Sequence, residues 1–273
     1  PATLVRDAQR HGVVVRSIDI ASSMWECALE EVQGEEEGRK AVRLGLKFVK
    51  GLSRNAGMRI IEERGKHPFE SVSDLVARTG LLKDEVLALA ECGALACLGK
   101  KRRDAMWQAL QASVATRLLR GALQEETEEN LPSMTGFEEV VADYVTTGVS
   151  CGTHPVSFFR EALSKKGVIS ACELESKKDG ERVKVGGMVI VRQRPGTAKG
   201  MFFATLEDET GLINVAVTKE VFETNRHVLT VAGFLVVEGV VQKRDGVLSV
   251  LGKRFERLDV QSNKSATEVL SFP

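Results

Sequence analysis

The sequence is poor in the patterns that metal sites, disulfide frameworks and membrane spans require. Its cysteines are odd in number and form no C-x-x-C pair, and its four histidines lie far apart. We therefore expect reduced thiols in a cytoplasmic protein and no metal site. No apolar run approaches the roughly 20 residues of a membrane span, and no signal peptide is visible, so no membrane partner is expected. The cysteines are Cys27, Cys92, Cys97, Cys151 and Cys172.

The chain also lacks net charge, because 38 basic residues balance 38 acidic ones. Any binding of a polyanion must therefore come from local patches rather than from a global field. The charge is segregated: residues 40–66 hold eight bases and two acids, whereas residues 121–143 hold seven acids and no base. With 273 residues, 43% of them hydrophobic, the chain is predicted to fold as about two globular domains. It starts with Pro1 rather than Met, which suggests a fragment.

The basic stretch at residues 42–65 predicts a helix-hairpin-helix. Two apolar segments flank the turn Lys50-Gly51-Leu52-Ser53. Gly51 can adopt backbone conformations closed to other residues, and Ser53 is a suitable N-cap for the second helix. Backbone N–H groups at such a helix start can bind a phosphate. The alternative is a helical hairpin whose basic face is merely solvated. The candidate DNA contacts are Lys50, Gly51, Leu52, Ser53 and Arg54.

A second, similar unit follows at residues 82–110. A helix ends at Gly93, an apolar turn spans residues 94–99, and four consecutive bases then open another helix. The repeated layout predicts two hairpins packed as a pair. Bases at a helix start oppose the macrodipole, and a bound phosphate would offset that cost. A solvated run of charge is the alternative. The candidate contacts here are Lys100, Lys101, Arg102 and Arg103.

The middle of the chain, residues 121–180, is predicted to be an acidic connector followed by short helices. Pro132 and Gly136 mark turns, and Pro155 suits the first turn of a helix. His154 is expected to pack or to cap that helix, because no partner nucleophile for catalysis is in view.

From about Glu181 the hydrophobic period changes to two. The order is three strands, a helix and two strands, the last two joined by a turn at Asp245-Gly246. This order predicts a five-stranded OB-fold barrel. The fold class is thus α+β and multi-domain, with a helical tandem helix-hairpin-helix domain followed by the barrel.

OB-folds bind single strands on the face of strands 2 and 3 and in two neighbouring loops. The corresponding loops carry bases, and two phenylalanines lie on strand 2, so that one of them should face outward as a stacking platform. The alternative is that both phenylalanines pack inside and the loop bases are solvated. The candidate single-strand contacts are Arg192, Arg194, Lys199, Phe202, Phe203, Lys243 and Arg244.

Several stretches together resemble the C-terminal half of bacterial C-family DNA polymerases. They are AVRLGLKFVKGLS, ECGALACLGKKRRDAMW, DYVTTGVSCGTHPVSFFR and VIVRQRPGTAKGMFFATLEDETGLINVAV. Their order and spacing match over nearly the whole chain. The chain looks most like the error-prone, translesion paralogue of the DNA polymerase III alpha subunit. It shows no clamp-binding Q-x-x-L/M-x-F peptide around Gln108, Gln111 or Gln124, and it ends soon after the last strand.

The resemblance implies a domain order: residues 1–35 as the tail of the fingers, 36–120 as the hairpin domain, 121–180 as the connector, 181–260 as the OB-fold and 261–273 as a tail. It implies that the catalytic palm, with its Mg²⁺ ions, precedes Pro1, so no catalytic residue and no metal ligand is assigned here. The implied partners are duplex and single-stranded DNA, an inactive Y-family protein that reaches the sliding clamp, and a RecA-like accessory protein.

Two alternatives stay open at this point. One is a protein-interaction module that docks the accessory proteins and binds little DNA itself, which the zero net charge and the acidic run favour. The other is the same region of the replicative DNA polymerase III alpha subunit from a lineage with an altered clamp motif.

Overall fold

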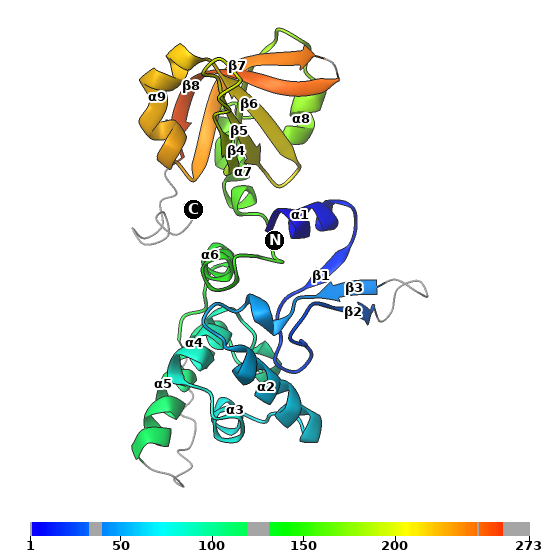
Figure 1. Ribbon diagram of the computed structural model, residues 1–273, viewed down its shortest axis with the longest axis vertical. Helices are drawn as coiled ribbons and strands as arrows, with labels where there is room; N and C mark the ends of the chain where they lie inside the picture. Colours follow the sequence, from blue (N-terminus) through cyan, green and yellow to red (C-terminus); the bar gives the residue numbers. More distant parts are fainter. Residues whose placement is uncertain (1, 33–39, 119–130, 245, 259–273) are drawn as a thin grey trace. The chain divides into compact units, whose positions relative to one another are not determined.

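The computed structural model describes residues 2–32, 40–118, 131–244 and 246–258 (Figure 1). It divides into two compact units, Pro1–Gly152 and Thr153–Pro273, and each is described by itself. The residues predicted as a connector are therefore shared between the units. The acidic residues at 125–129 and the C-terminal tail at 261–273 lie outside the described residues.

The first unit begins with a helix and a small sheet. Helix α1 ends just before Gly12, whose φ of +79° breaks the helix. Strand β3 lies between β1, which is parallel to it, and β2, which is antiparallel. The bounds are α1 Ala2–Arg10, β1 Val14–Arg16, β2 Ala28–Glu31 and β3 Lys40–Arg43.

The predicted first helix of the hairpin at residues 42–65 is wrong. Residues 40–43 form strand β3, and a short 3₁₀ helix, η1 (Leu46–Phe48), leads into the turn. Gly45 explains the difference, because a Cβ there would lie 2.4 Å from the Trp25 carbonyl oxygen. The backbone runs against its neighbour at this point, and Leu46 N–H donates to the Met24 carbonyl at 2.9 Å. This pairing with a distant segment prevails over local helix formation.

Four helices form the rest of the core of the first unit (Figure 1). Their starts are fixed by side chains: the hydroxyls of Ser53 and Ser71 cap α2 and α3, and Glu85 caps α4. Helices α4 and α5 form the helix-turn-helix predicted at residues 82–110, with Gly93 in the turn at a φ of +79°. The bounds are α2 Arg54–Lys66, α3 Val72–Thr79, α4 Lys83–Glu91, η2 Ala96–Leu98 and α5 Arg102–Leu118.

Helix α6 (Gly136–Thr147) also belongs to the first unit. A capping box between Thr135 and Glu138 starts it, and Gly148, with a φ of +72°, ends it. It packs on α4, and its last turn receives a hydrogen bond of 2.7 Å from the Lys50 backbone N–H to the Thr146 carbonyl. The turn before α2 is thereby anchored to α6.

The second unit is the predicted five-stranded OB-fold barrel. The strands close in the order β4-β5-β6-β8-β7, with helix α9 between β6 and β7. Alternate residues point into one apolar core, as period-two patterning predicted. The bounds are β4 Arg182–Gln193, β5 Phe202–Glu207, β6 Leu212–Val217, α9 Lys219–Val231, β7 Phe234–Arg244 and β8 Val247–Arg257.

Short helices precede the barrel and are tied to the turn after β5. Asp208 is 1% exposed and accepts hydrogen bonds from the backbone N–H groups of Ala171 and Gly211 at 2.8 and 2.9 Å. Arg160 donates to the same carboxylate at 3.1 Å and pairs with Glu209. The bounds are η3 Pro155–Phe159, α7 Arg160–Lys165 and α8 Ala171–Glu175.

His154 caps η3 as expected, because its Nδ1 accepts a hydrogen bond of 3.2 Å from the Val156 N–H.

Candidate nucleic-acid interface

The turn before α2 presents backbone N–H groups to solvent. Gly51 has a φ of +85°, a conformation that favours glycine. Among the described residues, none accepts a hydrogen bond from the backbone N–H of Gly51, Arg54 or Asn55. All three residues are exposed at the start of a 13-residue helix. This is the arrangement that binds phosphate at a helix N-terminus.

The same helix start already carries an internal carboxylate. Glu85 Oε1 accepts hydrogen bonds from the Ser53 hydroxyl at 2.9 Å and from the Ser53 N–H at 3.4 Å. Ser53 Oγ in turn accepts from the Ala56 N–H at 3.2 Å. Ser53 is thus the helix cap that the sequence predicted. The sequence did not reveal that its hydroxyl and backbone N–H are already bound by Glu85.

The side chains of the other three candidates in this turn, Lys50, Leu52 and Arg54, differ in their exposure to solvent. Leu52 is 8% exposed and its side chain packs in the core, so a contact of this residue with DNA would have to be made through its backbone. Lys50 is exposed, and its Nζ lies 3.4 Å from the Tyr144 carbonyl oxygen. Arg54 is exposed, with no hydrogen bond or ion pair to another described residue. Lys50 and Arg54 are therefore the side chains that flank the open N–H groups.

The four bases at the start of α5 do not act as one patch. Arg102 donates to Asp143 at 2.8 Å and to the Glu139 carbonyl at 3.0 Å, and its guanidinium lies against Gly93. Arg103 pairs with Glu138 at 3.0 Å. Helix α6 therefore supplies the negative charge that a phosphate was expected to supply. Lys101 is exposed and Lys100 half-exposed.

The pKa values of the two α6 carboxylates, Glu138 and Asp143, shift in opposite directions. Hydrogen bonds from the Thr135 backbone N–H and hydroxyl, together with the attraction of Arg103, lower the pKa of Glu138. Burial raises the pKa of Asp143, against the opposing effect of Arg102.

In the barrel, the Arg192 side chain is engaged within the protein and is not open to DNA. Its guanidinium donates to the carbonyls of Leu229, at 3.0 Å, and Ala232, which end helix α9, and burial lowers its pKa. Arg194 pairs with Glu223 at 2.7 Å and stacks over the Phe222 ring. Both contacts lie on α9, so these two bases brace the loop against the helix.

Lys199 differs from its neighbours in the same loop. It is exposed, has a φ of +51° and makes no hydrogen bond or ion pair with another described residue. It is the loop base that remains open to a ligand.

The two phenylalanines of β5 point in opposite directions. Phe202 is 4% exposed and stacks on Phe222 with ring centroids 4.8 Å apart, so it is the inward-facing member of the pair and its ring is not available to stack on a base. Phe203 lies on the outer face and is half-buried. The register places Gln193 and Ala216 beside it, on β4 and β6. Phe203 is therefore the residue placed to stack on a base.

At the β7–β8 turn, Lys243 and Arg244 are both exposed. Lys243 Nζ donates to the Glu175 carbonyl at 3.0 Å, and its backbone N–H donates to Asp179 at 2.8 Å. Arg244 has no hydrogen bond or ion pair within the described part of the chain.

The sequence reasoning missed a group of bases on β4 and β8. Arg182 and Lys184 occupy alternate positions of β4, and Lys253 and Arg254 lie on β8. The alternation of Arg182 and Lys184 with buried valines was a signal that both point to one side of the strand.

Two classes of site find no support in the described residues. No cluster of three or more His, Cys, Asp or Glu side chains there is placed to hold a metal ion, so no residue is assigned to Mg²⁺. None of the described helices combines the length and hydrophobicity of a membrane span.

Curated relatives align with nearly the whole chain. One from Alkalilimnicola ehrlichii, named error-prone DNA polymerase, is 39% identical over 256 residues, and one of the same name from Burkholderia pseudomallei is 42% identical over 261. The alignments cover 94% of this chain in both cases. The chain is related to the error-prone DNA polymerases. It spans about a quarter of the length of these relatives, 25% and 24%. The resemblance predicted from the motifs is confirmed.

Family models match both parts of the chain. A helix-hairpin-helix motif matches residues 12–105, and an OB-fold nucleic acid binding domain matches residues 183–258. The fold class predicted from the sequence is confirmed by these matches and by the closed barrel.

Solved structures overlap only partly with the chain. Asparaginyl-tRNA synthetase from Pyrococcus horikoshii is 21% identical, with a TM-score of 0.30, over 36% of this chain and 27% of that one. The hypothetical protein ygiW from E. coli is 18% identical, with a TM-score of 0.27, over 33% of this chain and 89% of that one. Scores of this size carry no functional information.

Proposed function

We propose that this region holds DNA for an error-prone polymerase without reading its sequence. The turn before α2 contacts a phosphate of duplex DNA through its backbone N–H groups, with Lys50 and Arg54 on neighbouring phosphates. The observation that carries the proposal is the exposed helix start at which three N–H groups have no partner among the described residues. Lys101 extends this contact from the start of α5.

The outer face of β5 and β6 contacts single-stranded template. Phe203 offers a ring for stacking. Lys199 lies in the loop after β4 and Arg244 at the end of β7, and neither charge is paired within the described residues. Stacking on an aromatic ring tolerates any base, which suits a polymerase that must hold every template sequence.

The whole protein is proposed to be a DNA-directed DNA polymerase in damage-induced translesion synthesis, acting in the cytoplasm. The names of its relatives support this proposal. Catalysis and Mg²⁺ binding are proposed to belong to the part of the polymerase outside this chain, which spans about a quarter of the relatives' length. The proposed partners are an inactive Y-family protein, through which the sliding clamp is reached indirectly, and a RecA-like accessory protein.

A protein-interaction module is the second candidate. Internal carboxylates already engage several of the predicted DNA contacts: Glu85 holds Ser53, and α6 holds Arg102 and Arg103. A region whose bases are largely neutralised in this way would bind little DNA by itself and would serve chiefly to dock accessory proteins.

Fluorescence anisotropy of the 273-residue chain, with duplex and single-stranded DNA across a salt series, separates the two candidates. Replacing Lys50 and Arg54 by Ala should weaken duplex binding and lower the slope of log affinity against log salt by about 2, at roughly 0.9 per phosphate contact. The matched control replaces Lys40 and Lys66, two exposed bases elsewhere on the same unit, and should leave the slope unchanged.

An unchanged affinity and slope in the Lys50/Arg54 variant would refute the hairpin assignment. Absence of binding by the unmodified chain at low salt would favour the interaction module.

A further inference from the structure

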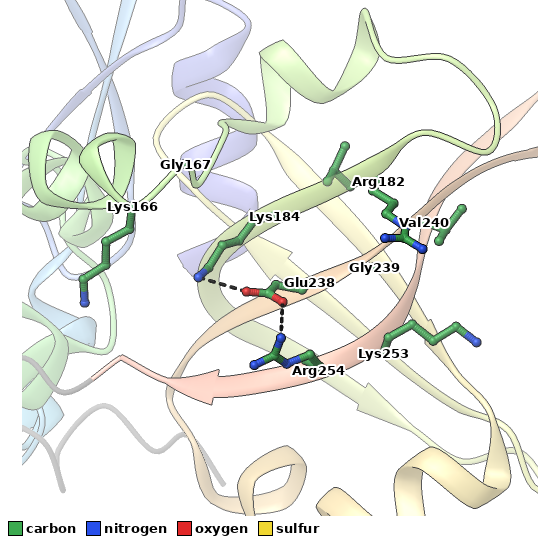
Figure 2. A pocket seen from close by; sticks show the side chains of 10 residues that line it. Lys166, Gly167, Arg182, Lys184, Glu238, Gly239, Val240, Lys253 and Arg254 are labelled. Atoms are coloured by element: carbon green, nitrogen blue, oxygen red, sulfur yellow. Dashed lines mark ion pairs between the residues drawn. The ribbon is translucent and has the colours of Figure 1, made fainter.

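The barrel carries a basic groove on β4, β7 and β8 with a volume of about 650 Å³ (Figure 2). Five of its ten lining residues are basic, and one is acidic. No aromatic residue lines it. The lining residues are Lys166, Gly167, Arg182, Val183, Lys184, Glu238, Gly239, Val240, Lys253 and Arg254.

The centre of the groove is an ion-paired row across three strands. The register sets Lys184, Glu238 and Arg254 side by side, with N–O distances of 3.1 and 3.4 Å to Glu238 (Figure 2). The hydrogen bond from Lys184 lowers the pKa of Glu238, so this carboxylate is ionised at neutral pH. One acid thus faces two bases, and the row keeps a net positive charge.

The other three bases of the groove form no ion pair within the described residues. Lys166, Arg182 and Lys253 are exposed, and within the described residues none of them makes a hydrogen bond or an ion pair. Together with the central row, they give the groove five positive charges against one negative charge. An excess of this size in one concave surface attracts a polyanion.

The lining of the groove favours the sugar-phosphate backbone of a nucleic acid over its bases. Gly239, which lines the groove, pairs with Gly252 at a register shift between β7 and β8, and neither residue has a side chain. The floor is therefore bare backbone at this point. Without an aromatic ring, the groove has no surface on which a base could stack.

We propose that this groove binds the phosphodiester backbone of single-stranded nucleic acid, whatever its bases. A bound peptide commonly adds a strand to an exposed sheet edge, and the closed barrel leaves no such edge on β4, β7 or β8. In the order of strands, β7 lies farthest from the β5–β6 pair, so the groove is on the opposite wall from Phe203. A single nucleic-acid strand that wraps around the barrel would contact both Phe203 and the groove. The inference rests on the proposed DNA-binding function.

The test compares two probes with the 273-residue chain: a dT oligonucleotide and an abasic sugar-phosphate strand of equal length. Replacing Lys166, Arg182 and Lys253 by Ala should weaken both probes alike, on the order of tenfold at low salt, and lower the salt slope by about 2, at roughly 0.7 per phosphate of a single strand. These three side chains are exposed, so the variant should keep the circular dichroism spectrum and melting temperature of the parent chain.

The matched control removes three exposed bases outside the groove and should change neither affinity nor slope. Its substitutions are Lys165→Ala, Lys178→Ala and Arg226→Ala.

A gain of affinity is expected from Glu238→Gln. It removes the negative charge at the centre and releases Lys184 and Arg254, so both probes should bind about two- to fivefold more tightly. Its control is Glu161→Gln, which breaks an exposed ion pair with Lys165 outside the groove and should have no effect.

The outcomes distinguish this inference from the function on which it rests. Phe203→Ala should weaken dT binding and leave the abasic strand unaffected. If Phe203→Ala weakens dT binding while the groove variants bind like their controls, the groove inference is wrong and the proposed function stands. If neither probe binds the parent chain at low salt, the groove inference and the proposed single-strand contact are both wrong, whereas duplex binding by the turn before α2 is judged by the salt series above. If poly-glutamate binds more tightly than the abasic strand and loses affinity in the groove variant, the occupant is an acidic protein segment and the inference is overturned.

Discussion

The Ser53 hydroxyl donates a hydrogen bond of 2.9 Å to Glu85 Oε1, which joins the start of α2 to the start of α4. The other oxygen of the same carboxylate accepts from the Leu82 backbone N–H at 3.0 Å. Glu85 is 6% exposed, so these bonds replace water that the carboxylate has lost. One acidic side chain thus satisfies donors from two helices and fixes the turn proposed to contact DNA.

Glu85→Ala should lower the free energy of unfolding by about 1–3 kcal/mol, because the Ser53 and Leu82 donors lose their acceptor and helix α4 loses its cap. Glu85→Gln keeps one acceptor oxygen and should cost less. Urea denaturation monitored by circular dichroism measures both. The control, Glu62→Ala on the exposed face of α2, should stay within about 0.5 kcal/mol of the parent chain. Equal stability of the Glu85 and Glu62 variants would contradict this account.

Arg102 and Lys101 should separate stability from DNA binding. Arg102→Ala removes the charged hydrogen bonds to Asp143 and the packing on Gly93, so it should destabilise the first unit by about 2 kcal/mol. Lys101→Ala should leave stability unchanged and weaken duplex binding at low salt. Thermal melts and anisotropy on the same samples check the pair. The opposite pattern would show that the phosphate contact lies at Arg102.

The adjacent phenylalanines of β5 give a sharper contrast. Phe202→Ala should destabilise the barrel by about 3–5 kcal/mol, because it empties a buried site against Phe222. Phe203→Ala should cost far less stability and should weaken single-strand binding by about 1–3 kcal/mol, the value of one stacked base. Denaturation curves and binding isotherms with dT measure both effects. Loss of binding in a folded Phe202 variant, but not in the Phe203 variant, would reverse the assignment.

The barrel could be predicted because neighbouring residues in the sequence specify its strands and turns. Period-two patterning marked the strands, and the Asp-Gly pair at 245–246 predicted a turn between the last two. That pattern could not say which phenylalanine faces inward, because Phe202 and Phe203 are adjacent and both suit a strand. The register with β6 decides it.

The hairpin was less predictable because distant residues decide it. Residues 40–43 pair with strands on either side and become β3. Arg102 and Arg103 looked like a phosphate site because the carboxylates that hold them come from α6, more than thirty residues further along the chain. Sequence motifs located the candidate interface, and only the folded chain shows which bases are already engaged.

The cysteines offer a test that needs no DNA. Burial raises the pKa values of the Cys92 and Cys151 thiols to about 12, whereas Cys27 and Cys172 are exposed. Iodoacetamide at pH 8 should therefore modify Cys27 and Cys172 in the folded chain, and Cys92 and Cys151 only after denaturation in urea. Peptide mass spectrometry identifies the modified sites. Modification of Cys92 as fast as of Cys27 would show that the α4–α5 hairpin opens readily.

The raised pKa of Cys92 also predicts how stability depends on pH. The folded state holds the thiol proton up to about pH 12, whereas the unfolded chain releases it near pH 9. The unfolded chain therefore binds fewer protons between these values, and the stabilisation, fully present below pH 9, is lost as pH rises toward 12. Cys92→Ala removes this contribution, so its stability should fall less steeply above pH 9, by on the order of 1 kcal/mol per pH unit. Urea titrations of parent and variant at pH 8, 9 and 10 measure the difference, and parallel pH profiles would show that the Cys92 thiol ionises as readily in the folded chain as in the unfolded one.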